Sequence, residues 1–304
     1  MSGRTARRAA RVAAQAKVNL LLRVLARESS GYHQIETLFI RLELADAVTV
    51  RVGGTDYSLD ARAERVDAAA LGPAEDNLAY RAALAYTAAA GWPTGFAIEL
   101  DKRIPVRGGL GGGSADAGAV LRVLNHLAPR PMPEEELLRI ATSLGADVPF
   151  LTARHAMALA WGRGERMLAL PPLPPRDVVI VIPPFGIATA EAYRWVDATR
   201  VDDVLAVGML TAEQLASWAS VEAISLNEFE PPVFAQHPRL ADAAHAIAAS
   251  GAALTRLSGS GATVFGLFED GVPPLPDPPP ADTPGWRTLL TRTADRVVEV
   301  ESVQ

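Results

Sequence analysis

The chain has 304 residues, a formal net charge of −6 and no cysteine. It therefore has no disulfide, no thiolate nucleophile and no zinc–thiolate site, and its five histidines lack the spacing of a catalytic zinc motif. The acidic balance disfavours broad nucleic-acid binding. No apolar run is long enough to cross a membrane, and the basic stretch from Arg4 to Arg11 has no signal-peptide core. We expect about two domains in a cytoplasmic protein that binds neither nucleic acid nor membrane.

Apolar residues at positions 18, 20, 22 and 24 share one face of the first predicted strand. Lys17 and Asn19 lie on the other face and point the same way, because side chains alternate along a strand. A half-buried lysine is costly unless it meets an anion, whereas a lysine at a strand end can also reach solvent. Both interpretations of Lys17 stay open from this pattern. A turn at residues 29–31 ends the segment.

Strands and helices follow in mixed order, which predicts an α+β fold. The helix after residue 77 has Asp76 or Asn77 as its cap, and the helix that starts at Pro133 ends at Gly145. Two proline-rich stretches, 171–175 and 273–284, predict loops or linkers. The other expected elements are strands over residues 48–52, 96–101, 178–182 and 264–268 and a helix over about 117–124.

A glycine-rich run joins the strand over 96–101 to the next helix. Its residues are Gly108, Gly109, Leu110, Gly111, Gly112, Gly113 and Ser114. Bare backbone N–H groups at a helix N-terminus, where the helix dipole is positive, suit a phosphate. The run lacks the lysine of a Walker A loop and the spacing of the dinucleotide fingerprint. A flexible turn is the alternative, but five glycines this close together weaken both neighbouring elements, so we predict phosphate binding.

Two further segments could carry chemistry. Asp147 follows the helix cap at Gly145, and alone it is more often a capping residue than a catalytic one. Phosphoryl transfer needs a carboxylate near the acceptor hydroxyl and a cation that keeps it charged, so Lys17 and Asp147 are candidates for this pair, although their spacing does not show that they meet. The small-residue loop over 257–262 is either a tight turn at a domain contact or a backbone that closes over a phosphate.

Taken together, these segments resemble the GHMP kinase superfamily, named for galactokinase, homoserine kinase, mevalonate kinase and phosphomevalonate kinase. The glycine run with Pro105, Val106 and Arg107 resembles its phosphate loop, and the loop over 257–262 resembles its C-terminal glycine motif. Segments 16–20, 31–39 and 144–149 are more specific, and resemble the branch that phosphorylates a cytidine diphosphate sugar alcohol on the non-mevalonate route to isoprenoids. The resemblance runs from about residue 14 to residue 268.

The resemblance implies a two-domain α+β fold. The N-terminal domain, residues 1–158, would be of ribosomal protein S5-like type, and the C-terminal domain, residues 159–304, would be ferredoxin-like, with the active site between them. It also implies ATP and Mg²⁺ as cofactors, since Mg²⁺ neutralises the phosphate oxygens. The expected partners are small-molecule substrates, with the protein a monomer or homodimer.

The resemblance also implies roles for single residues. Asp147 would take the proton from the 2-hydroxyl of the acceptor, and Lys17 would keep that carboxylate ionised and stabilise charge on the phosphoryl group. ATP would lie on Gly108–Ser114, with Asn77 and Lys102 near the adenosine. Tyr32 and His33 would bind the cytosine base, with Phe185 as the other stacking face. The full set of implied acceptor contacts is Asn19, Tyr32, His33, Phe185, Thr189, Gly259 and Gly261.

One position departs from the pattern, and other functions remain to be weighed. The most similar branch has Ser-Asn-Ala after Ser114, and here Asp116 places a negative charge near a phosphate site, where it could cap the helix or change nucleotide affinity.

A homoserine or mevalonate kinase is disfavoured by the Gly31–His33 segment, because those acceptors have no base to stack. A non-catalytic nucleotide-binding regulator is disfavoured by the intact Lys17 and Asp147. A dehydrogenase is disfavoured by the failed dinucleotide fingerprint.

Overall fold

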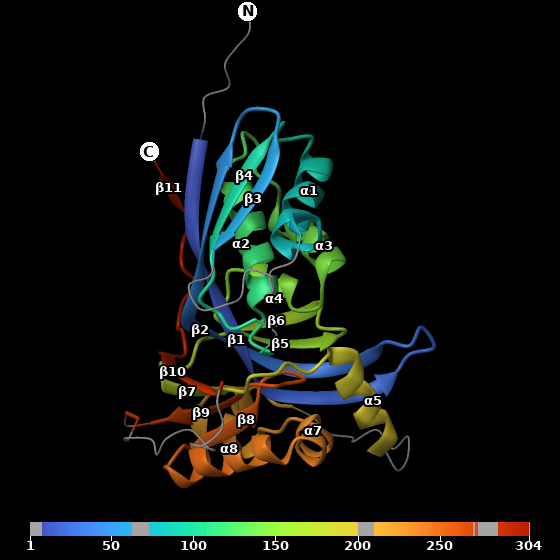
Figure 1. Ribbon diagram of the computed structural model, residues 1–304, viewed down its shortest axis with the longest axis vertical. Helices are drawn as coiled ribbons and strands as arrows, with labels where there is room; N and C mark the ends of the chain where they lie inside the picture. Colours follow the sequence, from blue (N-terminus) through green and yellow to red (C-terminus); the bar gives the residue numbers. More distant parts are fainter. Residues whose placement is uncertain are drawn as a thin grey trace, which may run out of the picture.

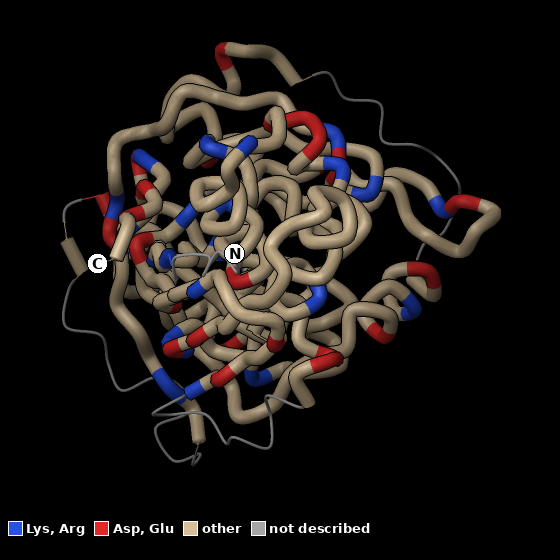
Figure 2. The backbone as a smooth tube through the Cα atoms, turned by 90° about the horizontal axis from the view of Figure 1, so that it is seen from above, with Lys and Arg blue, Asp and Glu red and all other residues tan. Residues whose placement is uncertain are grey.

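The computed structural model describes residues 8–62, 73–106, 108–199, 210–269, 271–272 and 285–303. Arg107 of the glycine-rich segment, Arg4 of the basic stretch and the proline-rich segment 273–284 lie outside the described residues. Among the helices described, none combines the length and hydropathy needed to cross a bilayer. Figure 2 shows positively and negatively charged residues interspersed along the described part of the chain.

The strands are β1 (Arg8–Arg27), β2 (His33–Val52), β3 (Tyr57–Arg62), β4 (Phe96–Asp101), β5 (Met157–Gly162), β6 (Arg166–Leu170), β7 (Asp177–Ile182), β8 (Leu254–Leu257), β9 (Val264–Phe268), β10 (Arg287–Arg292) and β11 (Glu301–Val303). The helices are α1 (Leu78–Ala90), α2 (Gly112–Leu127), α3 (Glu134–Leu144), α4 (Val148–Thr152), α5 (Thr189–Thr199), α6 (Trp218–Ile224), α7 (Glu230–Gln236) and α8 (Pro238–Ala249). Two short 3₁₀ turns are η2 (Ala74–Asp76) and η3 (Glu213–Leu215).

Two sheets organise these elements. The first runs β11-β1-β2-β4-β3, with β5 paired to β2 and β6 paired to β5, and all its pairs are antiparallel except β3 with β4. Helices α1, α2 and α3 lie on one side of it (Figure 1). The second sheet runs β10-β7-β9-β8 and lies at the other end of the molecule with α7 and α8 (Figure 1). Helix α2 buries Val120, Leu121 and Leu124 in the larger core, which stabilises the layer by about 1.5–3 kcal/mol per side chain.

The β1–β2 hairpin reaches both ends of the molecule. Each strand has 20 residues, roughly 65 Å at about 3.3 Å per residue, and the hairpin projects from the body in Figure 1. Val12 and Val18 belong to the larger hydrophobic cluster, whereas Leu22, Val24 and Ile35 pack with apolar residues of the second sheet. The strand expected over 18–24 is therefore the central part of a much longer one. Residues 9–16 are rich in alanine, which has low strand propensity, but pairing with β2 and β11 overrides it.

The two sheets do not divide the chain at residue 158. Strands β5 and β6 continue the first sheet to Leu170, and β11 returns to pair with the beginning of β1. The hairpin residues that pack on the second sheet come from the other end of the chain. The polypeptide therefore crosses between the two layers several times.

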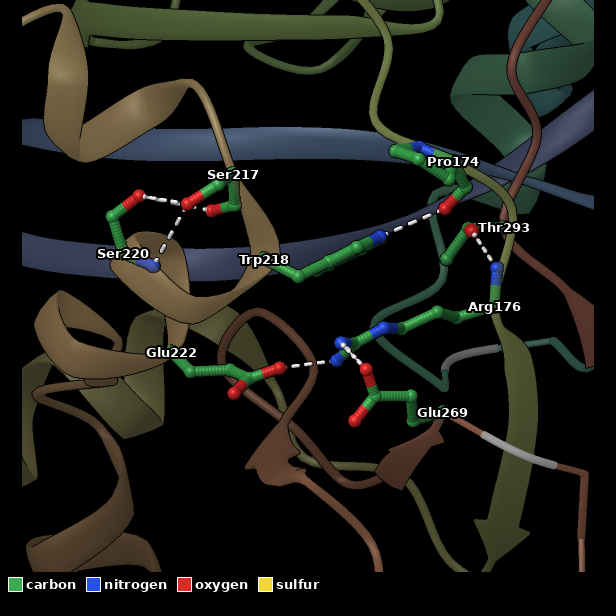
Figure 3. Close-up of polar contacts among 8 residues, drawn as sticks. All are labelled: Pro174, Arg176, Ser217, Trp218, Ser220, Glu222, Glu269 and Thr293. Atoms are coloured by element: carbon green, nitrogen blue, oxygen red, sulfur yellow. Dashed lines mark hydrogen bonds and ion pairs between the residues drawn. The ribbon is translucent and has the colours of Figure 1, made fainter.

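Arg176 fastens α6 to the connection between β6 and β7 (Figure 3). Its guanidinium lies 4.8 Å from the ring centroid of Trp218 and forms ion pairs with Glu222 of α6 and with Glu269, the latter at 3.6 Å. Trp218 Nε1 donates to the carbonyl of Pro174 at 2.8 Å. These contacts fix the helix that leads into residues 225–229, which lie against β1.

Candidate active site

Two adjoining cavities lie where the start of α2, the β1–β2 hairpin and α5 approach one another. The first has a volume of about 490 Å³, and its lining includes residues 108–114, which we call the phosphate loop, together with Lys17 and Asp147. The second, of about 1020 Å³, is lined by the tip of the hairpin and by one face of α5. Residues that line both are Ala146, Arg163, Thr189 and Tyr193.

The phosphate loop leads directly into α2. Gly111 is the N-cap, with φ of 72° and no side-chain cap, so no side chain of the cap covers the first amides of the helix. A Cβ on Gly109, where φ is 76°, would lie 2.2 Å from the carbonyl oxygen of Ser258. Ser258 Oγ also donates to the Gly109 carbonyl at 2.9 Å. The loop over 257–262 therefore lies against the phosphate loop, and Gly109 is what allows this approach.

Two buried lysines flank the start of α2. A Cβ on Gly111 would lie 3.1 Å from Lys17 Cγ, and one on Gly112 would lie 3.7 Å from Lys102 Nζ. Lys17 is 3% exposed and Lys102 is 8% exposed. An ammonium group this far from water needs negative charge nearby. Together with the amides of α2, the two lysines make this end of the cavity suited to a polyphosphate.

Lys17 and Asp147 meet, as the catalytic pairing requires. Lys17 Nζ donates to Asn19 Oδ1 at 2.8 Å and lies 3.4 Å from Asp147 Oδ2. Asn19 Nδ2 in turn donates to Thr37 Oγ1 at 2.8 Å, so Asn19 is held from the neighbouring strand. The backbone N–H of Lys17 donates to the carbonyl of Leu110 at 3.0 Å, which joins β1 to the phosphate loop.

Asp147 is the N-cap residue of α4 by position, but its side chain makes no cap hydrogen bond. The carboxylate is instead directed to Lys17 and is 31% exposed on the cavity. The capping interpretation, which the sequence favours for an isolated aspartate, therefore does not describe this side chain. A carboxylate that is charged, oriented by an ammonium and open to a ligand can act as a general base.

On the far side of the phosphate loop, Asn77 caps α1 by accepting from the N–H of Ala79 at 2.9 Å. Asn77 and Lys102 both line the first cavity. Asp116 lies inside α2 rather than at its cap, is 2% exposed, and forms an ion pair with Lys102. Burial raises the pKa of Asp116 to about 8.

The second cavity is framed by aromatic and charged side chains. His33 stacks on Tyr193 with 4.4 Å between ring centroids and an interplanar angle of 10°, and its Nε2 lies 2.7 Å from Asp197 Oδ1. Tyr32 is 60% exposed, and Arg163 lies 4.1 Å from its ring centroid. Burial, with a smaller contribution from Asp147, raises the pKa of Tyr193 to about 12, so this hydroxyl stays protonated.

Three predicted acceptor contacts lie near this junction, and one does not. Thr189 lines both cavities and Gly259 lines the first, while Gly261 is buried in the same loop with its Cβ position 3.1 Å from Ile187. Phe185 lines neither cavity, and its ring stacks on His237 with 4.8 Å between ring centroids. Phe185 is therefore absent from the lining of the cavity that Tyr32 and His33 border.

Tyr193 and Asp197 are the functional candidates that the sequence analysis missed. Both belong to α5, a helix that was not expected, and they follow Thr189 at intervals of four residues. Residues at such intervals share one face of a helix, and this face borders the second cavity. If the sequence analysis had predicted a helix from Thr189 onward, Tyr193 would have been expected one turn after Thr189, which is itself a predicted acceptor contact.

Among the described residues, no group of three or more His, Asp or Glu side chains could hold a metal ion. Mg²⁺ that accompanies a nucleotide takes its ligands mainly from phosphate oxygens and water, so such a group is not required. The cationic, amide-rich end of the first cavity fits a nucleotide polyphosphate.

Comparison with known proteins identifies the family of this chain. The GHMP kinases N terminal domain family matches residues 77–155, and the GHMP kinases C terminal family matches residues 210–274. A 4-diphosphocytidyl-2-C-methyl-D-erythritol kinase of Pelotomaculum thermopropionicum is 39% identical over 264 residues, which cover 84% of this chain and 88% of the relative. The chain belongs to this kinase family. The corresponding kinase of Deinococcus radiodurans is 40% identical over 258 residues, covering 84% of this chain and 83% of that protein.

Solved structures of this kinase family and of related kinases share the fold. A crystal structure of 4-(cytidine 5'-diphospho)-2C-methyl-D-erythritol kinase superposes with a TM-score of 0.73 at 36% identity, covering 93% of this chain and 99% of that one. A homoserine kinase from Cytophaga hutchinsonii superposes with a TM-score of 0.64 at 17% identity, covering 97% of each chain. The predicted α+β GHMP kinase fold and kinase family are therefore confirmed.

Proposed function

We propose that this kinase transfers the γ-phosphoryl group of ATP to the 2-hydroxyl of 4-diphosphocytidyl-2-C-methyl-D-erythritol, a step of the non-mevalonate route to isoprenoids. The observation that carries the proposal is the Lys17–Asp147 pair, which lines the first cavity with the phosphate loop. Ala146, the residue before Asp147, lines both cavities. The family membership supports the choice of acceptor. We further propose a cytoplasmic enzyme that works as a monomer or homodimer on small molecules alone.

ATP would bind with its phosphates on the phosphate loop. The amides at the start of α2 and the Lys17 ammonium supply positive potential there, while Asn77 and Lys102 border the space for the adenosine. Mg²⁺ would arrive with the phosphates and neutralise their oxygens. The protein's part is to hold the chain of phosphates in line with the acceptor.

Asp147 would accept the proton of the acceptor hydroxyl as the oxygen attacks phosphorus. Lys17 Nζ, 3.4 Å from its carboxylate, keeps that group charged and oriented, and can stabilise the negative charge that develops on the transferring group. Asn19 orients the ammonium group of Lys17 by accepting a hydrogen bond from it. The pair is thus a base and its orienting cation.

The cytosine base would occupy the second cavity. Tyr32 offers an exposed ring, and His33 offers a ring whose Nε2 is held by Asp197. We assign the role of second aromatic contact to Tyr193, because it borders both cavities and Phe185 borders neither. Thr189, one turn before Tyr193, would lie beside the diphosphate that links the base to the sugar alcohol.

The test is ADP release dependent on Mg²⁺ and ATP with three acceptors: 4-diphosphocytidyl-2-C-methyl-D-erythritol, homoserine and mevalonate. We expect turnover with the cytidine compound alone. Turnover with either of the others would retain the phosphate site and overturn the acceptor assignment. No turnover with any of the three, in protein that binds ATP, would instead favour a nucleotide-binding regulator.

A further inference from the structure

Beneath the nucleotide side of the cleft, one buried lysine is shared by two buried aspartates. Lys102, directly after β4, forms ion pairs with Asp46 of β2 and with Asp116 of α2. The side chains of Lys102, Asp46 and Asp116 are 6%, 0% and 3% exposed. Lys102 and Asp116 both line the first cavity. If both aspartates were ionised, the cluster of one ammonium and two carboxylates would carry a formal charge of −1 beside a site suited to a polyanion.

The two aspartates are not equivalent. Asp46 Oδ1 accepts from the backbone N–H groups of Arg103 and Ile104, at 2.5 and 2.8 Å, and its Oδ2 accepts from Lys102. Asp116 Oδ2 also accepts from Lys102, but its Oδ1 is buried without any hydrogen-bond partner. A buried charged oxygen without a donor is expensive. The negative charge is therefore much better accommodated on Asp46 than on Asp116.

Among the residues that the structure describes, Lys102 is the cation that forms an ion pair with Asp116. The described charged groups that line this cavity or pair with Lys102 are Lys17, Lys102, Asp46, Asp116, Asp147 and Arg163. Arg163 is paired with Glu28. Lys17 is matched by Asp147, and α1 contributes the uncharged Asn77 to the cleft. Arg122, farther along α2, donates to the carbonyl of Val298 instead. A proton on Asp116 makes this cluster of described residues neutral.

We propose that Asp116 is a neutral carboxylic acid in the resting kinase, and that its proton keeps the Lys102–Asp46–Asp116 cluster uncharged so that the nucleotide can bind. This rests on the proposed function insofar as the polyanion is ATP. Asp116 then acts as a positioning residue, because it anchors Lys102 without adding charge. The proposed protonation agrees with the pKa of Asp116, which is raised to about 8. Burial raises this pKa and Asp46 raises it further, whereas Lys102 lowers it.

Nucleotide binding and the Asp116 proton are consequently linked. Ionisation of Asp116 places a negative charge beside the phosphate loop, so it weakens the binding of ATP, and bound ATP in turn favours the protonated acid. Because burial raises the pKa of Asp116 into the range where the free protein is partly ionised at this site, binding takes up a fraction of a proton from solution. Between pH 7 and pH 9 the dissociation constant rises by up to about tenfold.

Infrared spectroscopy of the ligand-free protein, labelled with ¹³C at its aspartate carboxyl groups, tests the proton directly. We expect a protonated-carboxyl C=O band at pH 7 that disappears as the pH passes 8, and that is missing in Asp116→Asn. The label separates the band from Glu230, whose pKa burial also raises. The matched control is Asp101→Asn, an exposed aspartate next to Lys102 that should leave the band unchanged. A labelled wild-type protein without such a band would overturn the proposal even if the Asp116 variant fails to fold.

Calorimetric titration with Mg²⁺ and a non-hydrolysable ATP analogue, at pH 8 in two buffers of different ionisation enthalpy, tests the linkage. Wild type and Asp101→Asn should take up protons on binding, and Asp116→Asn should take up none and should keep its affinity from pH 7 to pH 9. Equal uptake in Asp116→Asn would overturn the proposal. A wrong acceptor would show only in the turnover assay, because neither experiment contains an acceptor.

Discussion

The role of Asp147 can be tested by substitution, because its carboxylate contacts Lys17 and makes no cap hydrogen bond to its own helix. We expect Asp147→Asn to lower kcat by about 10²–10⁴-fold, the usual contribution of a positioned general base, with little change in the KM for ATP. Steady-state kinetics with both substrates varied would measure this. Asp101→Asn, the same change at an exposed position, should keep full activity. Full activity in Asp147→Asn would remove this residue from the mechanism.

Tyr193 and Phe185 form a matched pair of aromatic residues, one at the cavities and one away from them. Stacking of a base on an aromatic ring contributes about 1–3 kcal/mol, so Tyr193→Ala should raise the acceptor KM roughly 10- to 100-fold and leave the KM for ATP nearly unchanged. Phe185→Ala, whose ring packs on His237, should change neither constant. The reverse pattern in initial-rate measurements would restore Phe185 as the stacking residue.

The buried acid Asp116 also links stability to pH. Its pKa is about 8 in the folded protein, whereas an ordinary aspartate has a pKa of 3.8, so between these limits the folded state holds a proton that the unfolded state has lost. Its contribution to stability is complete below about pH 4 and is lost as the pH rises through 8. The free energy of unfolding of wild type should therefore fall relative to that of Asp116→Asn between pH 5 and pH 8, by at least about 1 kcal/mol. Urea denaturation of both proteins at several pH values measures this, and parallel curves would contradict it.

Two of the three glycines of helix α2 have opposite surroundings. A Cβ on Gly118 would lie 2.7 Å from the backbone of Leu151 in α4, the helix that begins next to Asp147, whereas one on Gly113 would meet nothing within 4 Å. Gly118→Ala should cost about 1–3 kcal/mol of stability and lower kcat by displacing Asp147. Gly113→Ala should stabilise the helix by up to about 1 kcal/mol. Thermal unfolding and activity assays compare the two, and equal effects would argue against the close contact between α2 and α4.

Elements with a strong local pattern were predictable from the sequence, and those that depend on distant partners were not. The regular spacing and caps of α3 predicted it closely, and the apolar run of β7 predicted that strand. Helix α5 was missed because Tyr193, Trp195 and Val196 do not follow a clear apolar stripe among polar residues.

The candidate site divides in the same way. Its glycine loop and the Lys17 and Asp147 motifs are local in sequence, so they could be recognised. The contact between Lys17 and Asp147, and the buried ion pair between Asp116 of α2 and Lys102, arise from packing of segments far apart in the chain. No spacing rule contains that information.

The molecule as a whole should behave as one cooperative unit. The second sheet buries Val179 and Val264 against Leu22 and Ile35 of the β1–β2 hairpin. A fragment of residues 159–304 lacks these hairpin residues, so we expect it to be largely unfolded, whereas the full chain should unfold in a single transition. Circular dichroism and limited proteolysis of both would test this. A fragment with its own sharp thermal transition would show that the two layers fold independently.

The pairing of β11 with the beginning of β1 has a consequence for how the protein is made. Residues 9–11 pair with residues 301–303. During synthesis the outer edge at the beginning of β1 therefore stays unpaired until residues 301–303 have emerged from the ribosome. A bare strand edge is a template for aggregation. The alanine-rich run over 9–16 is a poor template, because its small side chains offer little to a foreign strand. The high alanine content that lowers the strand propensity of residues 9–16 thus also limits aggregation of the nascent chain until residues 301–303 can pair with them.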